Sequence, residues 1–431
     1  ILIWLCNIGA EKYWNKVNAG IIDKTEEILV NRVEEMNLLL CRKQDILILR
    51  EIPDPDYLKL LESLGFSKPV KMNPAEPEPL TPISELVLKD AGLLERLKDL
   101  ARGNPEVYFV PYAVTYLEEQ IAQNCGLTII GAPSRVNAAV NDKIANREIA
   151  EKIGFECCKG RICNTLDEVR QEYHRLVHEE PFFARVIIKE PHGASGKGLY
   201  IVESEEQLKT CLARLARFSR NKPDCRWLVE GWYDKKADLN YQIYISPEGA
   251  VNTFSIKQQL LRDTVYIGSK APPELEPEVL DLYRDYGRKI GRCLFEMGYS
   301  GVAGIDSIIT AENVPIPMVE INGRFTLSTY ISFIPEFLQR ELFLTRYYPV
   351  NTKMPLPYRD ICAMLDGRGL LFKPDKAVGV LIYTSGTLPS HQTVENGIYR
   401  GRLFALIVGN DWETIHEAQR QLDRFIEEIH Q

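Results

Sequence analysis

Two apolar runs between residues 302 and 324 carry side chains of the kind that hold a divalent cation. Asp306 lies in the first run, and beyond a polar turn the second run carries Glu320, Asn322 and Arg324. Residues two apart in a strand share a face, so pairing of the two runs as a hairpin would bring Asp306 to the same cleft as the others. Carboxylate and amide oxygens on strands suit Mg²⁺ bound together with phosphates, and the arginine suits a phosphoryl or carboxylate group. The competing interpretation is a solvated hairpin face with scattered charges.

A glycine-rich stretch, KEPHGASGKG at residues 189–198, lies between two expected strands, RVIIKE and LYIVE. Its glycine spacing and its strand-to-strand context exclude a P-loop, which joins a strand to a helix. We interpret the stretch as a hairpin flap whose backbone N–H groups approach phosphate oxygens, with Lys197 adding charge and Lys189 pointing from the strand end toward whatever the flap covers. Many glycine hairpins bind nothing, so this motif does not decide the function by itself.

Three further positions fit a nucleotide. The expected strand WLVE ends at Glu230 and is followed by Gly231, which offers a purine an acceptor for its exocyclic amine and adjacent backbone groups. Asp238 opens the next strand and could bind ribose hydroxyls, and Lys143, near the start of a helix, could reach a phosphate. The alternatives are an ordinary hairpin with a polar turn and a solvated helix lysine.

Composition narrows the class of protein. The chain has 431 residues, 45% of them hydrophobic, with a net charge of −8 and a pI of about 5.5. This length predicts two to four domains, and the charge excludes the basic footprint of a nucleic-acid-binding protein. The ten cysteines form no CxxC pair, which favours free thiols in a reducing compartment. Because no run reaches the roughly 20 apolar residues of a membrane helix, we expect a cytoplasmic protein without membrane contact.

Three units are expected to position these residues. Alternating strands and helices in residues 1–133 predict an α/β domain with a parallel sheet, in which 83–101 is one helix and 70–82 a loop rich in Pro and Glu. Residues 134–225 begin with a polar-faced helix over 140–154 and contain the glycine flap. Residues 226–431 are rich in strands and end in an amphipathic helix over 412–430.

The order of the signals resembles the ATP-grasp ligases over about residues 134–330. A helix lysine, a strand lysine, the glycine flap, an acidic strand end, a ribose acid and an Asp…Glu-x-Asn hairpin follow one another. The resemblance implies a mixed α/β (α+β) ATP-grasp fold preceded by the parallel α/β domain. It also implies the cofactors ATP and Mg²⁺.

The resemblance implies a role for each candidate residue. Lys143 and Lys189 would contact the ATP phosphates, and Asp306, Glu320 and Asn322 would hold Mg²⁺. The remaining nucleotide contacts would come from His192, Gly193, Ser195, Gly196, Lys197 and Gly198 over the phosphates, from Glu230, Gly231, Trp232 and Tyr233 at adenine, and from Asp238 at ribose. One position departs from the pattern. Gly304 stands where many members have an arginine two residues before the metal aspartate, so we expect Arg324, with Lys189, to meet the transition-state charge.

The stretches NIGAEKYW and INGRFTLSTY look most similar to a subgroup with a distinctive preceding domain. That subgroup includes natural-product peptide ligases and the glutamate–acyl-carrier-protein ligase of butirosin-type aminoglycoside assembly, an antibiotic pathway. The resemblance implies ADP-forming ligation of a small carboxylate, best an amino acid such as glutamate, to the phosphopantetheine thiol of an acyl carrier protein. Amide-bond formation and a regulatory module that binds ATP without turnover are the alternatives. The oligomeric state is not indicated.

Overall fold

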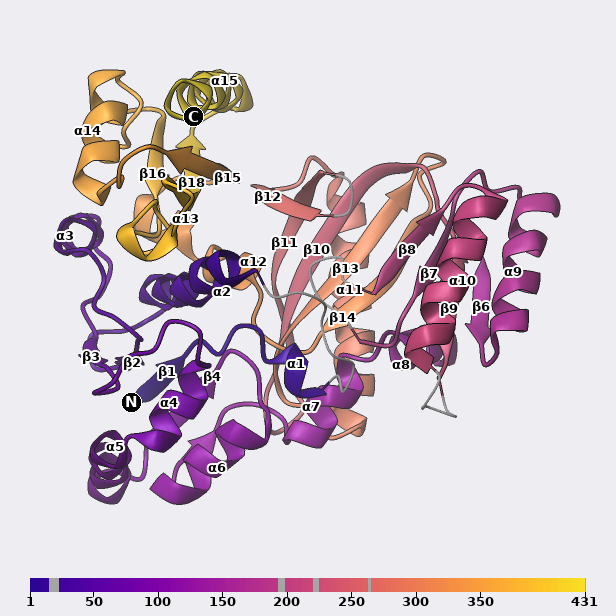
Figure 1. Cartoon of the computed structure of the whole chain (residues 1–431), viewed down its shortest axis with the longest axis horizontal. Helices are drawn as coiled ribbons and strands as arrows, with labels where there is room; N and C mark the ends of the chain where they lie inside the picture. The colour runs from indigo at the N-terminus through magenta and orange to yellow at the C-terminus, as the bar shows by residue number, and fades with distance from the viewer. Residues whose placement is uncertain (15–22, 193–197, 220–224, 263–264, 431) are drawn as a thin grey trace.

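The computed structural model describes residues 1–14, 23–192, 198–219, 225–262 and 265–430. In these residues the strands form three sheets, of five, four and nine strands. Figure 1 shows the five-stranded sheet and the C-terminal lobe at one end of the molecule and the four-stranded sheet at the other, with the nine-stranded sheet reaching between them. This arrangement confirms a mixed α/β fold with an N-terminal parallel domain.

The N-terminal sheet is parallel and has the strand order β3-β2-β1-β4-β5. Its strands are β1 (Leu2–Leu5), β2 (Ile46–Ile48), β3 (Val70–Met72), β4 (Tyr108–Pro111) and β5 (Thr128–Ile129). The accompanying helices are α1 (Glu11–Trp14), α2 (Lys24–Asn31), η1 (Arg32–Leu39), α3 (Pro55–Ser63), α4 (Ile83–Lys89), α5 (Ala91–Gly103) and α6 (Tyr116–Cys125). Apolar strand residues such as Ile3, Leu5 and Phe109 are fully buried, as a parallel sheet covered on both faces requires.

Two local expectations for this domain were wrong. The helix expected over 83–101 is two helices, which are separated at Asp90. The Asp90 carboxylate accepts hydrogen bonds from the backbone N–H groups of Leu93 and Ala75, both at 2.8 Å, and Asp90 has an extended conformation. Asp90 is thereby the N-cap of α5. The expected loop 70–82 begins with β3, whose three residues pair with β2.

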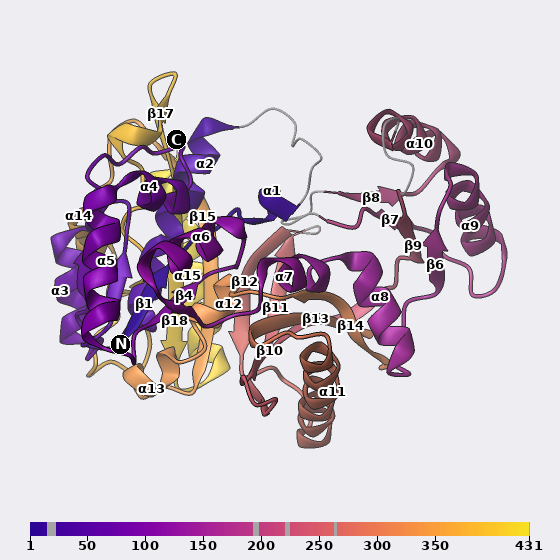
Figure 2. The same ribbon diagram turned by 90° about the horizontal axis from the view of Figure 1, so that it is seen from below.

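The four-stranded sheet is antiparallel, in the order β6 (Gly160–Cys163), β9 (Trp227–Gly231), β7 (Val186–Lys189) and β8 (Leu199–Val202). Helices α9 (Leu166–His178) and α10 (Glu205–Ser219) pack against it through a shared apolar core (Figure 2). The preceding stretch is α7 (Ser134–Val140) and α8 (Lys143–Lys152), so the helix expected over 140–154 starts only at Lys143, behind the N-cap Asp142. The sheet includes β9 and therefore extends past residue 225.

The nine-stranded sheet joins the central unit to the C-terminal lobe. Its path is β14-β13-β10-β11-β12-β15-β18-β16, with β17 paired to β18. The strands are β10 (Lys235–Ile245), β11 (Val251–Arg262), β12 (Val265–Ala271), β13 (Gly301–Thr310), β14 (Pro315–Asn322), β15 (Leu342–Thr352), β16 (Gly379–Ile382), β17 (Val394–Glu395) and β18 (Ile398–Gly409). The helices of this half are α11 (Pro277–Glu296), α12 (Leu327–Tyr330), α13 (Ile334–Leu338), α14 (Tyr358–Gly367), the short η2 (His391–Thr393) and α15 (Trp412–Ile429).

The central part of this sheet has one apolar and one polar face. Leu239, Tyr241 and Ile243 of β10 alternate with polar residues and pack, with Ile305 and Ile321, against α11. The opposite face, called the polar face below, carries Asp238, Asn240 and Gln242 of β10, Ser255, Lys257 and Gln259 of β11, Asp306 of β13, and Glu320 and Asn322 of β14, as the pairing registers require. Because apolar and polar residues alternate along these strands, one face of the sheet is packed against α11 and the other carries the polar side chains.

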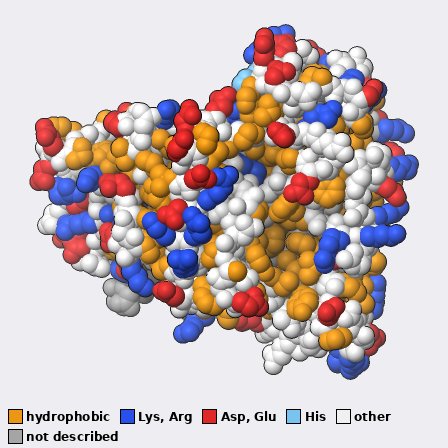
Figure 3. Space-filling view, turned by 180° about the vertical axis from the view of Figure 1, so that it is seen from behind, with side chains coloured by type: hydrophobic (Ala, Val, Ile, Leu, Met, Phe, Trp, Pro, Cys, Tyr) orange, Lys and Arg blue, Asp and Glu red, His pale blue; other side chains and the backbone are white. Residues whose placement is uncertain are grey.

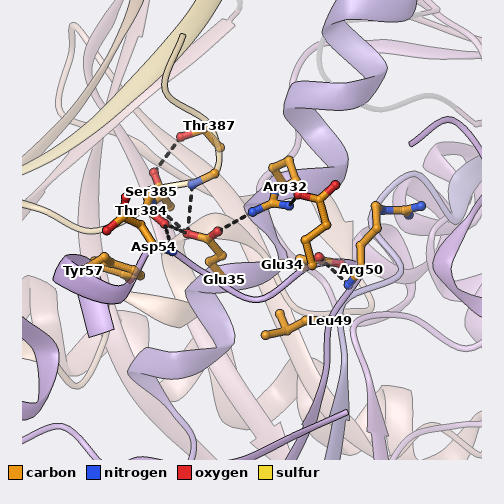
Figure 4. Close-up of polar contacts among 12 residues, drawn as sticks. Arg32, Glu34, Glu35, Leu49, Arg50, Asp54, Tyr57, Thr384, Ser385 and Thr387 are labelled. Carbon is orange, nitrogen blue, oxygen red and sulfur yellow. Dashed lines mark hydrogen bonds and ion pairs between the residues drawn. The ribbon is translucent and has the colours of Figure 1, made fainter. Parts of the chain in front are cut away.

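The N-terminal domain is joined to the C-terminal lobe by a buried charge cluster (Figure 4). Glu35 is fully buried, accepts hydrogen bonds from the backbone N–H groups of Ser385 and Gly386 at 2.7 and 3.0 Å, and pairs with Arg32 at 2.9 Å. A side chain at Gly386 would collide with the Arg32 guanidinium, so the glycine permits this close approach.

Acidic and basic side chains are interspersed over the face seen from behind (Figure 3). This mixture agrees with the many exposed ion pairs of opposite sign and differs from the one-sign footprint of nucleic-acid recognition. Within the described ranges, the helices include none with the length and apolar character needed to cross a membrane.

Candidate functional site

Strands β13 and β14 pair in the register that the sequence indicated. Asp306 lies directly opposite Glu320, and Gly304 opposite Asn322, so the three polar side chains share the polar face. The amide nitrogen of Asn322 donates to Asp306 Oδ2 at 3.0 Å. The expected hairpin is confirmed, and its three oxygen-bearing side chains lie together at one end of the sheet.

The surroundings of Asp306 fit a cation. Asn240 and Gln259 each donate a side-chain hydrogen bond to Asp306 Oδ1, at 2.8 and 2.9 Å, which fixes the orientation of the carboxylate. Burial and the neighbouring Glu320 carboxylate raise the pKa of Asp306 to about 6. A divalent cation between the two carboxylates would offset both effects, because it compensates the repulsion and replaces lost hydration. The oxygen set suits Mg²⁺ sharing its coordination with phosphates.

Lys143 reaches this cluster from the start of α8. Its Nζ lies 2.9 Å from Glu320 Oε1, and its side chain is almost entirely buried. The helix starts there because the Asp142 carboxylate accepts a hydrogen bond from the Ile144 N–H at 2.7 Å. The helix therefore places an ammonium group beside the candidate metal ligands.

The second expected lysine lies in another buried pair. Lys189, the last residue of β7, has its Nζ 2.6 Å from Glu230 Oε2, and Arg147 of α8 contacts Glu230 Oε1 at 2.8 Å. Despite burial, which acts to lower it, the pKa of Lys189 is raised by Glu230. Glu230 is thus shared by two cations. Sequence reasoning did not identify Arg147.

Two of the backbone N–H groups that follow Glu230 already donate hydrogen bonds within the protein. The N–H of Gly231 donates to the Lys159 carbonyl at 2.8 Å, and that of Trp232 donates to the Arg185 carbonyl at 2.9 Å. In the described ranges the Tyr233 N–H donates to no backbone carbonyl. Of the N–H groups of Gly231, Trp232 and Tyr233, that of Tyr233 is therefore the one left for a ligand.

Asp238 belongs to the polar face, in line with Asn240. Its carboxylate is paired with Lys235 at 2.6 Å and is partly exposed. It lies two residues before Asn240, which donates to Asp306, and its contact with ribose stays a prediction.

The glycine flap is described only at its two ends. Gly193, Ser195, Gly196 and Lys197 lie outside the described residues. The Pro191 carbonyl accepts a hydrogen bond from the Lys143 N–H at 2.8 Å, and His192 Nε2 lies 3.8 Å from the Asp142 carboxylate. Gly198 closes the hairpin through its carbonyl, which accepts from the Glu190 N–H at 2.8 Å. The base of the flap therefore adjoins the start of α8 and Lys143.

Arg324 connects the metal-ligand set to the N-terminal domain. Its Nη1 donates to the Tyr112 hydroxyl at 2.9 Å, and its Nε lies 2.8 Å from Glu11 Oε1. Although burial acts to lower it, the pKa of Arg324 is raised by Tyr112, Glu11, Glu320 and Asp306. The charges of both carboxylates of the candidate metal site thus act on the guanidinium, whose direct side-chain contacts are with two residues of the preceding domain.

Several residues of the site escaped sequence reasoning. Asn240, Gln259 and Lys257 could have been found from the alternation of polar and apolar types along β10 and β11. Lys257 is 1% exposed, and its Nζ contacts Ser255 Oγ, the Ser328 carbonyl at 3.1 Å and Ser332 Oγ at 2.7 Å.

Comparisons with known proteins agree with this geometry. The Pre ATP-grasp domain model matches residues 33–127, the ATP-grasp domain model matches residues 148–325, and the PGM1 C-terminal domain model matches residues 360–422. Two solved structures share the fold over nearly the whole chain. They are an N5-carboxyaminoimidazole ribonucleotide synthetase with ADP (TM-score 0.56, 12% identity, 98% of this chain and 95% of that one) and the biotin carboxylase domain of Hydrogenobacter thermophilus 2-oxoglutarate carboxylase with MgADP (TM-score 0.57, 15%, 97% and 88%).

The chain accordingly has the ATP-grasp fold and carries a pre-ATP-grasp domain followed by an ATP-grasp domain. A particular relative is the butirosin acyl-carrier-protein–L-glutamate ligase of Niallia circulans, 26% identical over 365 residues, which cover 83% of this chain and 81% of that protein. The formate-dependent phosphoribosylglycinamide formyltransferase of Methanocaldococcus jannaschii is 24% identical over 55% of this chain and 58% of its own length.

Proposed function

We propose that this chain is an ATP-dependent, ADP-forming carboxylate ligase that acts through an acyl phosphate. One observation carries the proposal: Asp306, Glu320 and Asn322 lie in register on the polar face, with Lys143 paired to Glu320 and Arg324 two residues after Asn322. These groups converge on one point, where the terminal phosphates of a metal-bound nucleotide would lie. The ATP-grasp fold and relatives crystallised with ADP or MgADP support ATP and Mg²⁺ as the ligands.

In this mechanism the protein positions and neutralises charge. Asp306, Glu320 and Asn322 would hold Mg²⁺, which supplies Lewis-acid polarisation of the phosphates. Lys143 and Lys189 bind phosphate oxygens, and Arg324 orients the substrate carboxylate and meets the charge that develops during its attack on the γ-phosphate. The products of this step are the acyl phosphate and ADP. A nucleophile then attacks the acyl carbon and releases phosphate.

For the acceptor, we propose the thiol of an acyl carrier protein and, for the carboxylate, an amino acid such as glutamate. This part rests on the similarity to the Niallia circulans ligase. Formation of an amide bond with an amine is the second candidate. A regulatory module that binds ATP without turnover is the third, and the complete set of metal-ligand types argues against it.

Trapping of the acyl phosphate tests the proposal. With ATP, Mg²⁺ and an amino acid, hydroxylamine should yield a hydroxamate and ADP without any acceptor. Stoichiometric AMP and pyrophosphate would contradict the reaction class. Mass spectrometry with and without a carrier protein then distinguishes thioester from amide products.

A further inference from the structure

Glu11, a residue of the pre-ATP-grasp domain, extends the site beyond the roles assigned so far. We propose that Glu11 is a specificity-determining residue that binds the ammonium group of an amino-acid substrate while Arg324 binds its carboxylate. The inference rests on the proposed function and adds a recognition residue to the same site.

The ion pair between Glu11 and Arg324 is the first observation. Glu11 Oε1 lies 2.8 Å from Arg324 Nε, and the Nε–H makes no directed hydrogen bond, so the contact is one of charge. The arginine side chain is 10% exposed and the glutamate 19%, so the pair is largely shielded from solvent without being sealed. Both side chains therefore keep some surface that a ligand could contact.

Each partner keeps an unused atom. Arg324 Nη1 is committed to the Tyr112 hydroxyl and to the Phe325 carbonyl at 3.1 Å. Within the described ranges, Arg324 Nη2 donates no hydrogen bond and Glu11 Oε2 accepts none. One guanidinium nitrogen of Arg324 and one carboxylate oxygen of Glu11 therefore remain for hydrogen bonds to a ligand.

The pair lies where an open α/β sheet commonly binds ligands. The order β3-β2-β1-β4-β5 reverses between β1 and β4, and the crevice outside the carboxyl ends of those strands is the usual ligand position. Glu11 follows β1 and Tyr112 follows β4, and the Tyr112 carbonyl accepts a hydrogen bond from the Phe325 N–H at 3.0 Å. This crevice is thereby joined to the end of β14, beside the candidate metal ligands.

Charge then selects the class of substrate. A carboxylate without a compensating cation would approach an arginine that is already paired with Glu11 and that follows the acidic Glu320 by four residues. A molecule that also carries an ammonium group would place this positive charge against Glu11, and the attraction between the two would compensate for the weakened attraction of its carboxylate to Arg324. The pair is complementary to a zwitterion, so we expect amino acids to be preferred over the same acids without the amino group.

Paired substrates test this inference. Hydroxamate formation with ATP, Mg²⁺ and hydroxylamine would be measured for L-glutamate against glutarate and for L-alanine against propionate. The wild-type chain should favour the amino acid of at least one pair by tenfold or more in kcat/KM. Glu11→Gln should lower that amino acid's kcat/KM by about tenfold to a hundredfold, the effect of losing a hydrogen bond to a charged group, and leave the des-amino acid unchanged or improved. Equal losses for both acids would show that Glu11 only positions Arg324, and would overturn the inference.

Tyr13→Phe is the matched control. Tyr13 anchors the same helix, α1, by donating to Glu85 Oε1 at 2.8 Å, and its loss leaves the charge beside Arg324 unaltered. The substrate ratio of this variant should equal that of the wild type.

If Glu11→Gln does not fold, Glu11→Asp replaces it and should keep the preference for amino acids; a lost preference there overturns the inference. If the wild type activates both members of each pair equally, the ligase proposal stands and Glu11 has no selective role; if it activates none, both proposals fail.

Discussion

Glu320 makes the two contacts that decide the charge of the candidate metal site. It faces Asp306 across the hairpin and pairs with Lys143 at 2.9 Å. We predict that Glu320→Gln keeps the fold and lowers ADP release by orders of magnitude, because the shape is retained while one charge of the metal clamp is lost. Circular dichroism would verify folding, and ADP release near the wild-type rate from a folded variant would remove Glu320 from the set of ligands.

Lys257 gives the molecule a pH dependence of stability. Burial lowers its pKa to about 7 from 10.5, and in the described part of the chain no carboxylate contacts it. Between these two values the unfolded chain binds the proton and the folded chain does not, so stability rises with pH from about 7 to 10.5. The slope from this group approaches about 1.4 kcal/mol per pH unit.

The variant Lys257→Met isolates this contribution. Denaturant unfolding at several pH values should show the wild type gaining stability relative to Lys257→Met as the pH rises from about 7. Parallel pH profiles for the two proteins would mean that Lys257 has an ordinary pKa in the folded chain.

At the scale of single residues, the sequence predicted the residues that share a strand but not those that meet across domains. Glu320 and Asn322 could be placed on one face because the strand period is two. The contact of Glu11 with Arg324 depends on how the two domains pack, and a lone glutamate after a first strand has no local signal for it. The contact of Arg147 with Glu230 depends in the same way on tertiary packing, here of α8 beside β9.

Among the elements, strands β12 and β15 form the join between the ATP-grasp sheet and the C-terminal lobe. Their backbones are so close at Gly268 that a Cβ there would lie 1.8 Å from the Thr345 carbonyl oxygen. We predict that Gly268→Ala lowers the free energy of unfolding by about 1–3 kcal/mol, because the strands must separate to admit the methyl group. Gly367→Ala, with no atom within 4 Å of the added Cβ, is the control and should leave the melting temperature unchanged.

Prediction of the elements succeeded where the hydrophobic period was unbroken and failed where a side chain intervened. The amphipathic helix expected over 412–430 is α15, Trp412–Ile429. The helix expected over 83–101 is divided by the Asp90 cap, whose two backbone partners include Ala75, outside the helix. The helical spacing of residues 83–101 gives no information on a hydrogen bond to Ala75, so the break at Asp90 could not be predicted from it.

For the whole molecule, the Glu35 cluster holds the first domain to the last. We predict that Glu35→Ala costs about 3–5 kcal/mol of stability, because it leaves the N–H groups of Ser385 and Gly386 buried without their acceptor and leaves the buried Arg32 with Glu51 as its one remaining carboxylate partner among the described residues. Glu26→Ala removes a partly exposed pair with Arg402 between the same two parts and should cost less than about 1 kcal/mol. Chemical denaturation of both variants distinguishes them; equal effects would contradict the role of Glu35.

At this scale the fold class could be predicted from the order of the sequence motifs along the chain, because each motif is recognised from residues that are close in sequence. The continuity of the nine-stranded sheet was not predicted. Lys270 pairs with Leu344 only after three helices and a hairpin intervene, and no turn between them specifies that register.

That junction also bears on how the chain folds during synthesis. Strands β10 to β14 pair mostly with neighbours in sequence, so a nascent chain released up to residue 325 already contains every partner of the candidate metal site on this sheet. The edge at β12 stays open until β15 emerges from the ribosome, and unpaired edges of this kind recruit strands from other chains. We therefore expect the edge of β12 to be exposed to other chains in the interval between translation of residues 271 and 352.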